Sequence, residues 1–112
     1  MEPDLNHVVL TGSLERDPVA RFADHGMQHV SFRLRVCEIG PTGQIFTLFV
    51  PVEAYSQVAE LVGDLHAGAS VLISGKLKWI SWSDKSGAKR TTLAVLARLV
   101  KRLAPVAAAA TV

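Results

Sequence analysis

The chain has 112 residues, of which 49% are hydrophobic and 20% charged, and its formal net charge is +2. This length fits one domain, and folding buries roughly two-thirds of the unfolded surface, enough for a core without metal or disulfides. The single cysteine excludes an intrachain disulfide and favours a cytoplasmic location, and no apolar run approaches the ~20 residues of a membrane span.

The first half of the chain predicts two strands. Residues 7–14 (HVVLTGSL) are rich in β-branched residues, and the following ERDP is a turn signal. Residues 29–36 alternate between apolar and polar side chains, which is typical of a half-buried antiparallel strand. The alternation places Arg33 and Arg35 together on the outer face of this second strand.

A hairpin is predicted next. Residues 40–43 (GPTG) are turn residues that lead into a third strand over residues 44–52. This strand is apolar on both faces, with Phe46, Leu48 and Val50 on one side and Ile45 and Phe49 on the other. One small barrel cannot cover both faces, so we expect a homo-oligomer, a dimer or a tetramer.

The spacing of the apolar residues then changes from every second residue to that of a helix. Apolar residues at i, i+3, i+4 and i+7 predict a short amphipathic helix over residues 53–65. Residues 70–82 predict a long strand in which Gly75 marks a bend or bulge. Residues 83–88 are a turn, and a last strand runs from residue 89 at least to Leu99, although its leucines also suit a helix.

This order predicts an all-β fold, a five-stranded OB-fold Greek-key barrel with one short helix between strands 3 and 4. The barrel domain covers residues 1–103, and residues 104–112 form a short alanine-rich tail. Closure of an antiparallel sheet also removes its unpaired edges.

The sequence lacks the arrangements typical of catalysis. The motifs G-x-S-x-G, H-E-x-x-H and C-x-x-C are absent, and four scattered histidines with one cysteine form no zinc pattern. We therefore expect no enzymatic activity, no cofactor and no metal.

Charge is divided unevenly along the chain. Residues 1–75 carry four basic and nine acidic side chains, whereas residues 76–112 carry eight basic and one acidic. Such asymmetry indicates a polyanionic partner.

Alternation also places Lys76, Lys78, Ile80 and Trp82 on one face of the strand over residues 70–82. Cations that track phosphates and a ring that stacks on a base suit single-stranded nucleic acid.

The candidate nucleic-acid-binding residues lie on the two polar strand faces, on the apolar third strand and around the basic turn. They are Arg33, Arg35, Phe46, Lys76, Lys78, Trp79, Trp82, Lys85, Lys89 and Arg90. For Trp79, which shares a face with Leu77, packing against the core or a second subunit is an equal alternative.

The chain resembles bacterial single-stranded DNA-binding proteins. The resemblance is carried by residues 6–22 (NHVVLTGSLERDPVARF), by Gly26, Val30, Phe32, Leu34 and Val36, by the spaced residues of 65–77, and by residues 82–87 (WSDKSG). It implies an OB-fold that usually assembles as a tetramer and wraps single strands with basic and aromatic side chains. Trp82 matches a stacking tryptophan, and Lys78 matches a basic position.

The chain also departs from the family pattern. The stacking aromatic of the third strand corresponds to Leu48, and the one near the helix corresponds to Ala54. The acidic, phenylalanine-terminated tip that recruits repair and replication enzymes is replaced by APVAAAATV, so we expect no such recruitment.

The expected function is binding of single-stranded DNA without sequence specificity, in replication, recombination or repair, with RNA as a further possible ligand. One alternative is a helicase-loading factor similar to primosomal replication protein N. The other is an OB-fold interaction subunit with weakened DNA binding, which the missing aromatics favour.

Overall fold

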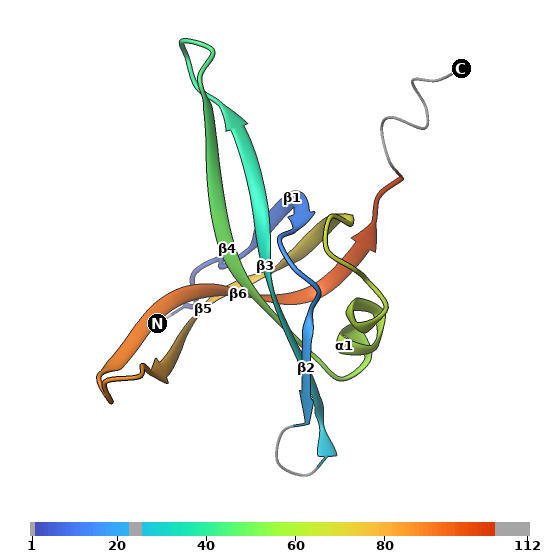
Figure 1. The fold of residues 1–112 in the computed structure, drawn as a ribbon, viewed down its shortest axis with the longest axis vertical. Coiled ribbons are helices and arrows are strands. Elements are labelled where there is room, and N and C mark those ends of the chain that lie inside the picture. Colours follow the sequence, from blue (N-terminus) through green and yellow to red (C-terminus); the bar gives the residue numbers. More distant parts are fainter. Residues whose placement is uncertain (1, 23–25, 105–112) are drawn as a thin grey trace.

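The computed structural model describes residues 2–22 and 26–104 (Figure 1). Its elements are β1 (Val8–Leu14), β2 (Val19–Phe22), β3 (Gln28–Ile39), β4 (Ile45–Tyr55), α1 (Ser56–Gly63), β5 (Ser70–Ser83) and β6 (Lys89–Arg102). The last strand is thus a strand throughout and not a helix. The predicted tail lies outside the described residues from position 105 onward.

The sheet closes into a barrel of five strands. The strand order is β1-β5-β6-β4-β3-β2, and an additional pairing of β1 with β3 completes the ring. The expected OB-like barrel is therefore confirmed. One detail was wrong: the pairing of β4 with β6 is parallel, so the barrel is not antiparallel throughout. The chain passes through α1 between β4 and β5, and these two strands are not neighbours in the sheet because β6 lies between them.

A sixth strand, β2, was not predicted. It pairs with the beginning of β3 over four residues, outside the closed ring. All four of its residues are exposed. Its sequence, VARF, therefore lacks the alternation of apolar and polar residues by which a half-buried strand is predicted.

Two glycines permit the close strand approaches that close the barrel. A Cβ at Gly12 in β1 would collide with the backbone carbonyl of Arg35 in β3, and one at Gly75 in β5 would collide with that of Leu96 in β6. The register of β5 against β6 shifts between Ser74 and Gly75, which confirms the predicted bulge.

The helix is shorter than predicted and begins later. Residues 53–55 continue β4, because Glu53 and Tyr55 pair with Ser31 and His29 of β3 and Ala54 is fully buried between them. The helix then starts at Ser56 and buries Ala59 and Val62 against the barrel. The helical spacing of the sequence also covers residues 53–55. These residues nevertheless form a strand, because pairing with β3 overrides the local pattern.

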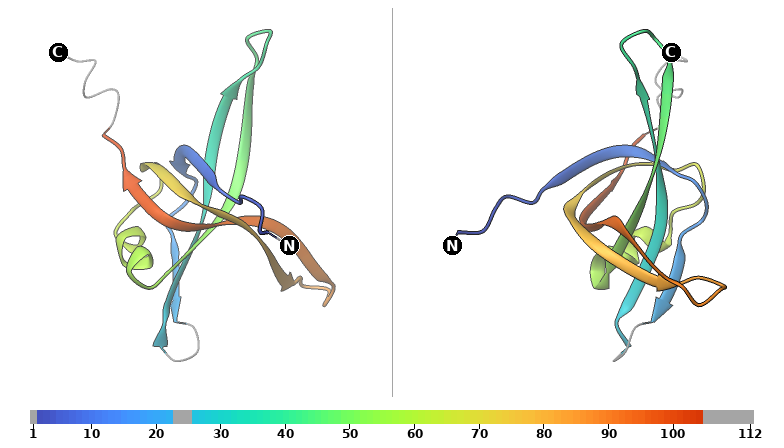
Figure 2. Two further views of the ribbon diagram at one scale, coloured as in Figure 1. Left: turned by 180° about the vertical axis from the view of Figure 1, so that it is seen from behind. Right: turned by 90° about the vertical axis from the view of Figure 1, so that its left-hand side faces the viewer.

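The core fills the barrel and stops short of two hairpin ends. The core residues include Val30, Leu34, Val52, Ile73 and Val95, all 0–1% exposed. Beyond the core, the β3–β4 hairpin and the β5–β6 hairpin both project from the barrel (Figures 1 and 2). We call the side of β3 to β6 that carries the core residues the core face, and the opposite side the outer face.

Candidate nucleic-acid interface

The outer face is continuous across four strands. Directly paired residues point to the same side of a sheet, and Arg33 pairs with Pro51, Glu53 with Leu96, and Leu96 with Lys76. Side chains two residues apart along each strand therefore share this face. Its members include His29, Ser31, Arg33, Arg35, Phe49, Pro51, Glu53, Tyr55, Lys76, Lys78, Ile80 and Trp82.

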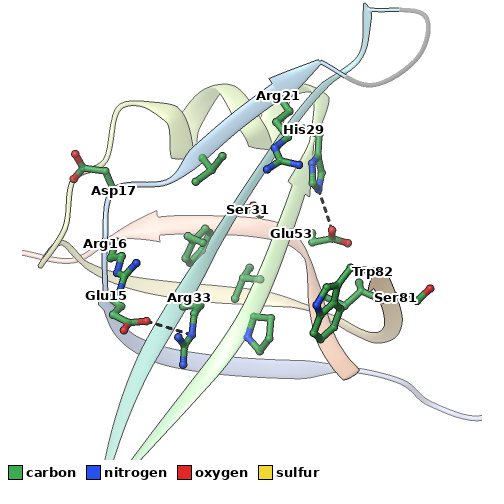
Figure 3. Close-up of a pocket in the computed structure, with 15 residues that line it drawn as sticks. Glu15, Arg16, Asp17, Arg21, His29, Ser31, Arg33, Glu53, Ser81 and Trp82 are labelled. Carbon is green, nitrogen blue, oxygen red and sulfur yellow. Dashed lines mark hydrogen bonds and ion pairs between the residues drawn. The ribbon is translucent and has the colours of Figure 1, made fainter. Parts of the chain in front are cut away.

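A groove of about 450 Å³ lies on the outer face. Its lining runs from Arg16 and Arg33 at one end, past Glu53, to Ser81 and Trp82 at the other (Figure 3). The tertiary structure thus brings Arg33, from the second predicted strand, onto one surface with Trp82, some fifty residues later in the sequence. We call this the groove.

Arg33 is held in place at one end of the groove. Its Nε lies 3.2 Å from the Glu15 carboxylate, and its guanidinium lies 4.8 Å from the centroid of the Phe49 ring. The side chain remains about half exposed, so its terminal nitrogens are available to an incoming anion. Arg35, two residues further along β3, is exposed on the same face.

Glu53 is the centre of a charged cluster in the middle of the groove face. Its carboxylate lies 3.0 Å from His29 Nε2 and 3.0 Å from Lys78 Nζ. The hydrogen bond to Glu53 raises the pKa of Lys78 above its ordinary value, and Lys78 also lies 5.6 Å from the Tyr55 ring centroid. Lys78 therefore lies on the outer face beside the groove, which it does not line, and its charge is already partnered.

The turn between β5 and β6 is organised by Asp84. Its carboxylate accepts hydrogen bonds from the Ser86 and Ala88 backbone, the Ser86 hydroxyl and Arg90 Nε, at 2.6–3.0 Å. The Ser86 hydroxyl and the Arg90 guanidinium lower the pKa of Asp84 below its ordinary value. This network fixes the hairpin that carries Trp82, whose side chain is 48% exposed.

The remaining basic candidates surround this hairpin. Arg90 pairs with Trp82 across the strands and is partnered by Asp84, whereas Lys89 pairs with Ser83 and falls on the other face. Lys85 is exposed in the turn itself. These three side chains surround the turn, and none of them lines the groove.

Two predicted aromatics lie on the core face. Phe46 pairs with Glu38, and Trp79 pairs with Leu93, so both extend the core side of their hairpins beyond the barrel. They are 50% and 68% exposed. The structure does not bring them together with Arg33, Lys78 and Trp82. Leu48 and Ala54, the positions assigned to missing stacking aromatics, also lie on the core face.

Sequence reasoning missed Phe49, Arg16 and Arg21 as members of this surface. Arg21 lies in β2, which was not predicted, and pairs with His29 beside the groove. Phe49 was noted only as an apolar side chain. The hairpin register, Arg35 opposite Phe49, is the signal that places it among the arginines.

Two further features are absent from the described residues, 2–22 and 26–104. In this part of the chain no three histidine, cysteine or acidic side chains come together as a metal-ion site. None of the described helices has the length and apolar character that crossing a membrane requires.

Comparison with known proteins gives a consistent result. The model of the single-strand binding protein family matches residues 5–103. A single-stranded DNA-binding protein of Caldanaerobacter subterraneus is 31% identical over 90% of this chain and 69% of its own length. The proteins of the same name from Thermus thermophilus and Thermus aquaticus are 34% and 36% identical over 88% of this chain. The chain spans only 37% and 38% of those two relatives. It belongs to the single-strand binding protein family.

Proposed function

We propose that the chain binds single-stranded DNA without sequence specificity, with the groove as the main contact surface. The observation that carries this is the continuous outer face, which places Arg33 and Trp82 along one groove. A relative named for single-stranded DNA binding matches most of the chain, and the family model covers its barrel.

The mechanism combines charge and stacking. Arg16, Arg21 and Arg33 offer cations to the phosphates, while the Trp82 ring stacks on an unpaired base. Arg35, Lys76, Lys85 and Arg90 add positive charge around this track. The proposed contacts use phosphates and the flat faces of bases, which all sequences share, so the binding is sequence-tolerant.

The test is a titration of labelled oligo-dT at several salt concentrations. Each neutralised phosphate on a single strand contributes a log–log slope of about −0.7, so three to five contacts give roughly −2 to −4 per protomer. Duplex of equal length is the control and binds more weakly, because paired bases offer no face to stack. Equal affinity for duplex and single strand contradicts the proposal.

One observation favours a second function, an interaction subunit with weakened DNA binding. The carboxylates of Glu15, Asp17 and Glu53 also line the groove, and the last of these partners Lys78. The same titration separates the two functions, since an interaction subunit with weakened DNA binding has a much lower affinity for oligo-dT. The proposed cellular role of the DNA-binding chain is replication, recombination or repair, in the cytoplasm, where Cys37 stays reduced.

We further propose that the chain forms a homo-oligomer, a dimer or a tetramer. The projecting hairpins expose large apolar side chains on the core face, where a single protomer leaves them uncovered. These are Phe46, Leu48, Leu77, Trp79 and Leu93, each 43–68% exposed. Apolar patches of this kind usually mark interfaces.

Sedimentation of the whole chain tests the assembly. We expect a mass at least twice 12.1 kDa, and a lower mass for Leu48→Ser combined with Trp79→Ser. A parent chain that sediments as a monomer at micromolar concentration contradicts the proposed assembly and leaves the proposed DNA binding unaffected.

A further inference from the structure

His29 stands on the outer face at the start of β3, between β2 and β4. It pairs directly with Arg21 of β2 on one side and with Tyr55 of β4 on the other. Its imidazole lines the groove beside Arg21 (Figure 3) and lies 4.7 Å from the Tyr55 ring, centroid to centroid. The side chain is only 19% exposed. The neighbouring strands therefore hold this histidine in one place on the groove surface.

Glu53 connects His29 to Lys78. One carboxylate oxygen, Oε2, lies 3.0 Å from His29 Nε2, and the other, Oε1, lies 3.0 Å from Lys78 Nζ. The Glu53 side chain is mostly buried, so solvent screens its charge less than at an open surface. A single negative charge thus has two nitrogen partners. The three side chains together carry no net charge when the imidazole is neutral and one positive charge when it is protonated.

Histidine is the side chain whose ordinary titration falls between about pH 5 and 8, and the groups around His29 keep their charge over this range. The titratable or charged groups that face it are Arg21 of β2, Glu53 and Tyr55 of β4, and Lys78 of β5. The hydrogen bond that Lys78 donates within the cluster raises its pKa, so it stays protonated. Helix α1 packs against β3 through its buried side, and its carboxylates, Glu60 and Asp64, are exposed.

We propose that His29 is a proton-sensitive determinant of affinity for single strands, because its protonation neutralises Glu53 and frees the charge of Lys78 for a phosphate. The inference rests on the proposed single-strand binding and extends it. At higher pH the carboxylate engages Lys78 and the cluster adds no charge to the groove. At lower pH the imidazolium holds the carboxylate, and one positive charge remains for the strand. Coupling between two ligands is reciprocal, so a strand that binds takes up protons at His29.

The first experiment measures the affinity of the whole chain for oligo-dT at about pH 5.5 and about pH 8, at one salt concentration. His29→Gln is the test variant, since its amide still donates a hydrogen bond to Glu53 but does not titrate. We expect the gain in affinity at low pH to be about two- to fivefold larger in the parent than in this variant. His7→Gln is the matched control and retains the parental gain, because His7 is exposed, contacts Ser74 and does not line the groove.

The second experiment counts protons and uses a permanent charge. Calorimetric titration with oligo-dT near pH 6.5, in two buffers of different ionisation enthalpy, gives the proton uptake on binding. We expect the parent to take up more protons than His29→Gln, by up to one per protomer. His29→Arg carries its charge at every pH, and we expect it to bind about two- to fivefold more tightly than the parent at about pH 8. This variant remains informative if His29→Gln fails to fold.

The outcomes separate the inference from the proposed function. A parent chain that binds no oligo-dT at either pH overturns the proposed function itself. A parent that binds, with the same pH dependence and the same proton uptake as a folded His29→Gln, overturns only the role of His29. A loss of affinity in His29→Gln that is equal at both pH values also overturns it, because the histidine then acts through packing and not through its charge.

Discussion

Lys78 Nζ and a carboxylate oxygen of Glu53 lie 3.0 Å apart on the outer face, where Glu53 lines the groove and Lys78 lies beside it. His29 approaches the same carboxylate at 3.0 Å. A carboxylate in the middle of a surface for phosphates opposes binding and occupies a cation that otherwise contacts the strand. We therefore expect Glu53 to lower the affinity of this chain for single-stranded DNA.

Replacing Glu53 by Gln is expected to tighten single-strand binding. The variant removes one negative charge and frees Lys78, so affinity for oligo-dT rises by about two- to fivefold at low salt, the scale of a partly exposed ion pair of ~0.5–1 kcal/mol. The salt slope steepens by up to about 0.7. Glu60→Gln on α1 makes the same change of charge away from the groove. An equal gain in both variants would assign the effect to net charge alone.

Trp82→Ala is expected to weaken binding without changing its salt dependence. Losing one base stack costs about 1–3 kcal/mol, while a ring releases no counterions, so the log–log slope stays as in the parent. Trp79→Ala provides the comparison, since Trp79 lies on the core face. Tryptophan quenching by oligo-dT persists in that variant and is largely lost in the first. Persistent quenching in Trp82→Ala would be incompatible with stacking at this position.

Asp84→Asn is expected to destabilise the fold at neutral pH and not in acid. The folded state lowers the pKa of Asp84, so its contribution is present above the ordinary carboxyl pKa and is lost as pH falls through the folded value. Melting temperatures of parent and variant therefore differ at pH 7 and converge as the pH falls through and below the lowered pKa of Asp84. A difference that persists in acid would mean that the hydrogen bonds of the turn do not depend on the carboxylate charge.

Gly75→Ala is expected to cost more stability than Gly87→Ala. A Cβ at Gly75 meets the Leu96 backbone, which cannot move without breaking the barrel seam, so we expect a loss of about 2–4 kcal/mol. Gly87 has a φ of +85° and open space around it, so its substitution costs only about 1 kcal/mol of backbone strain. Denaturant unfolding of both variants gives the comparison. Similar losses would show that β5 and β6 can separate at the bulge.

The sequence by itself determined the local elements and the side of each strand. Alternation places Arg33 with Arg35, and Lys78 with Trp82, because side chains two residues apart share a face of any strand. Other local signals also span only a few residues each. They are the turn residues of 40–43 and 83–88, the glycine of the bulge and the helical spacing before Leu65. These features were sufficient to predict an OB-like barrel of five strands.

Only the tertiary structure decided which faces adjoin. The parallel pairing of β4 with β6 brings Glu53 to Lys78, and the hairpin register puts Phe49 beside Arg33 and Arg35. The registers of β3 with β4 and of β5 with β6 assign Phe46 and Trp79 to the core face, and the pairing of β2 with β3 adds Arg21. Period-two alternation cannot supply this information, because it is identical for every register shifted by two residues. The register is selected by long-range contacts that fill the core and close the barrel.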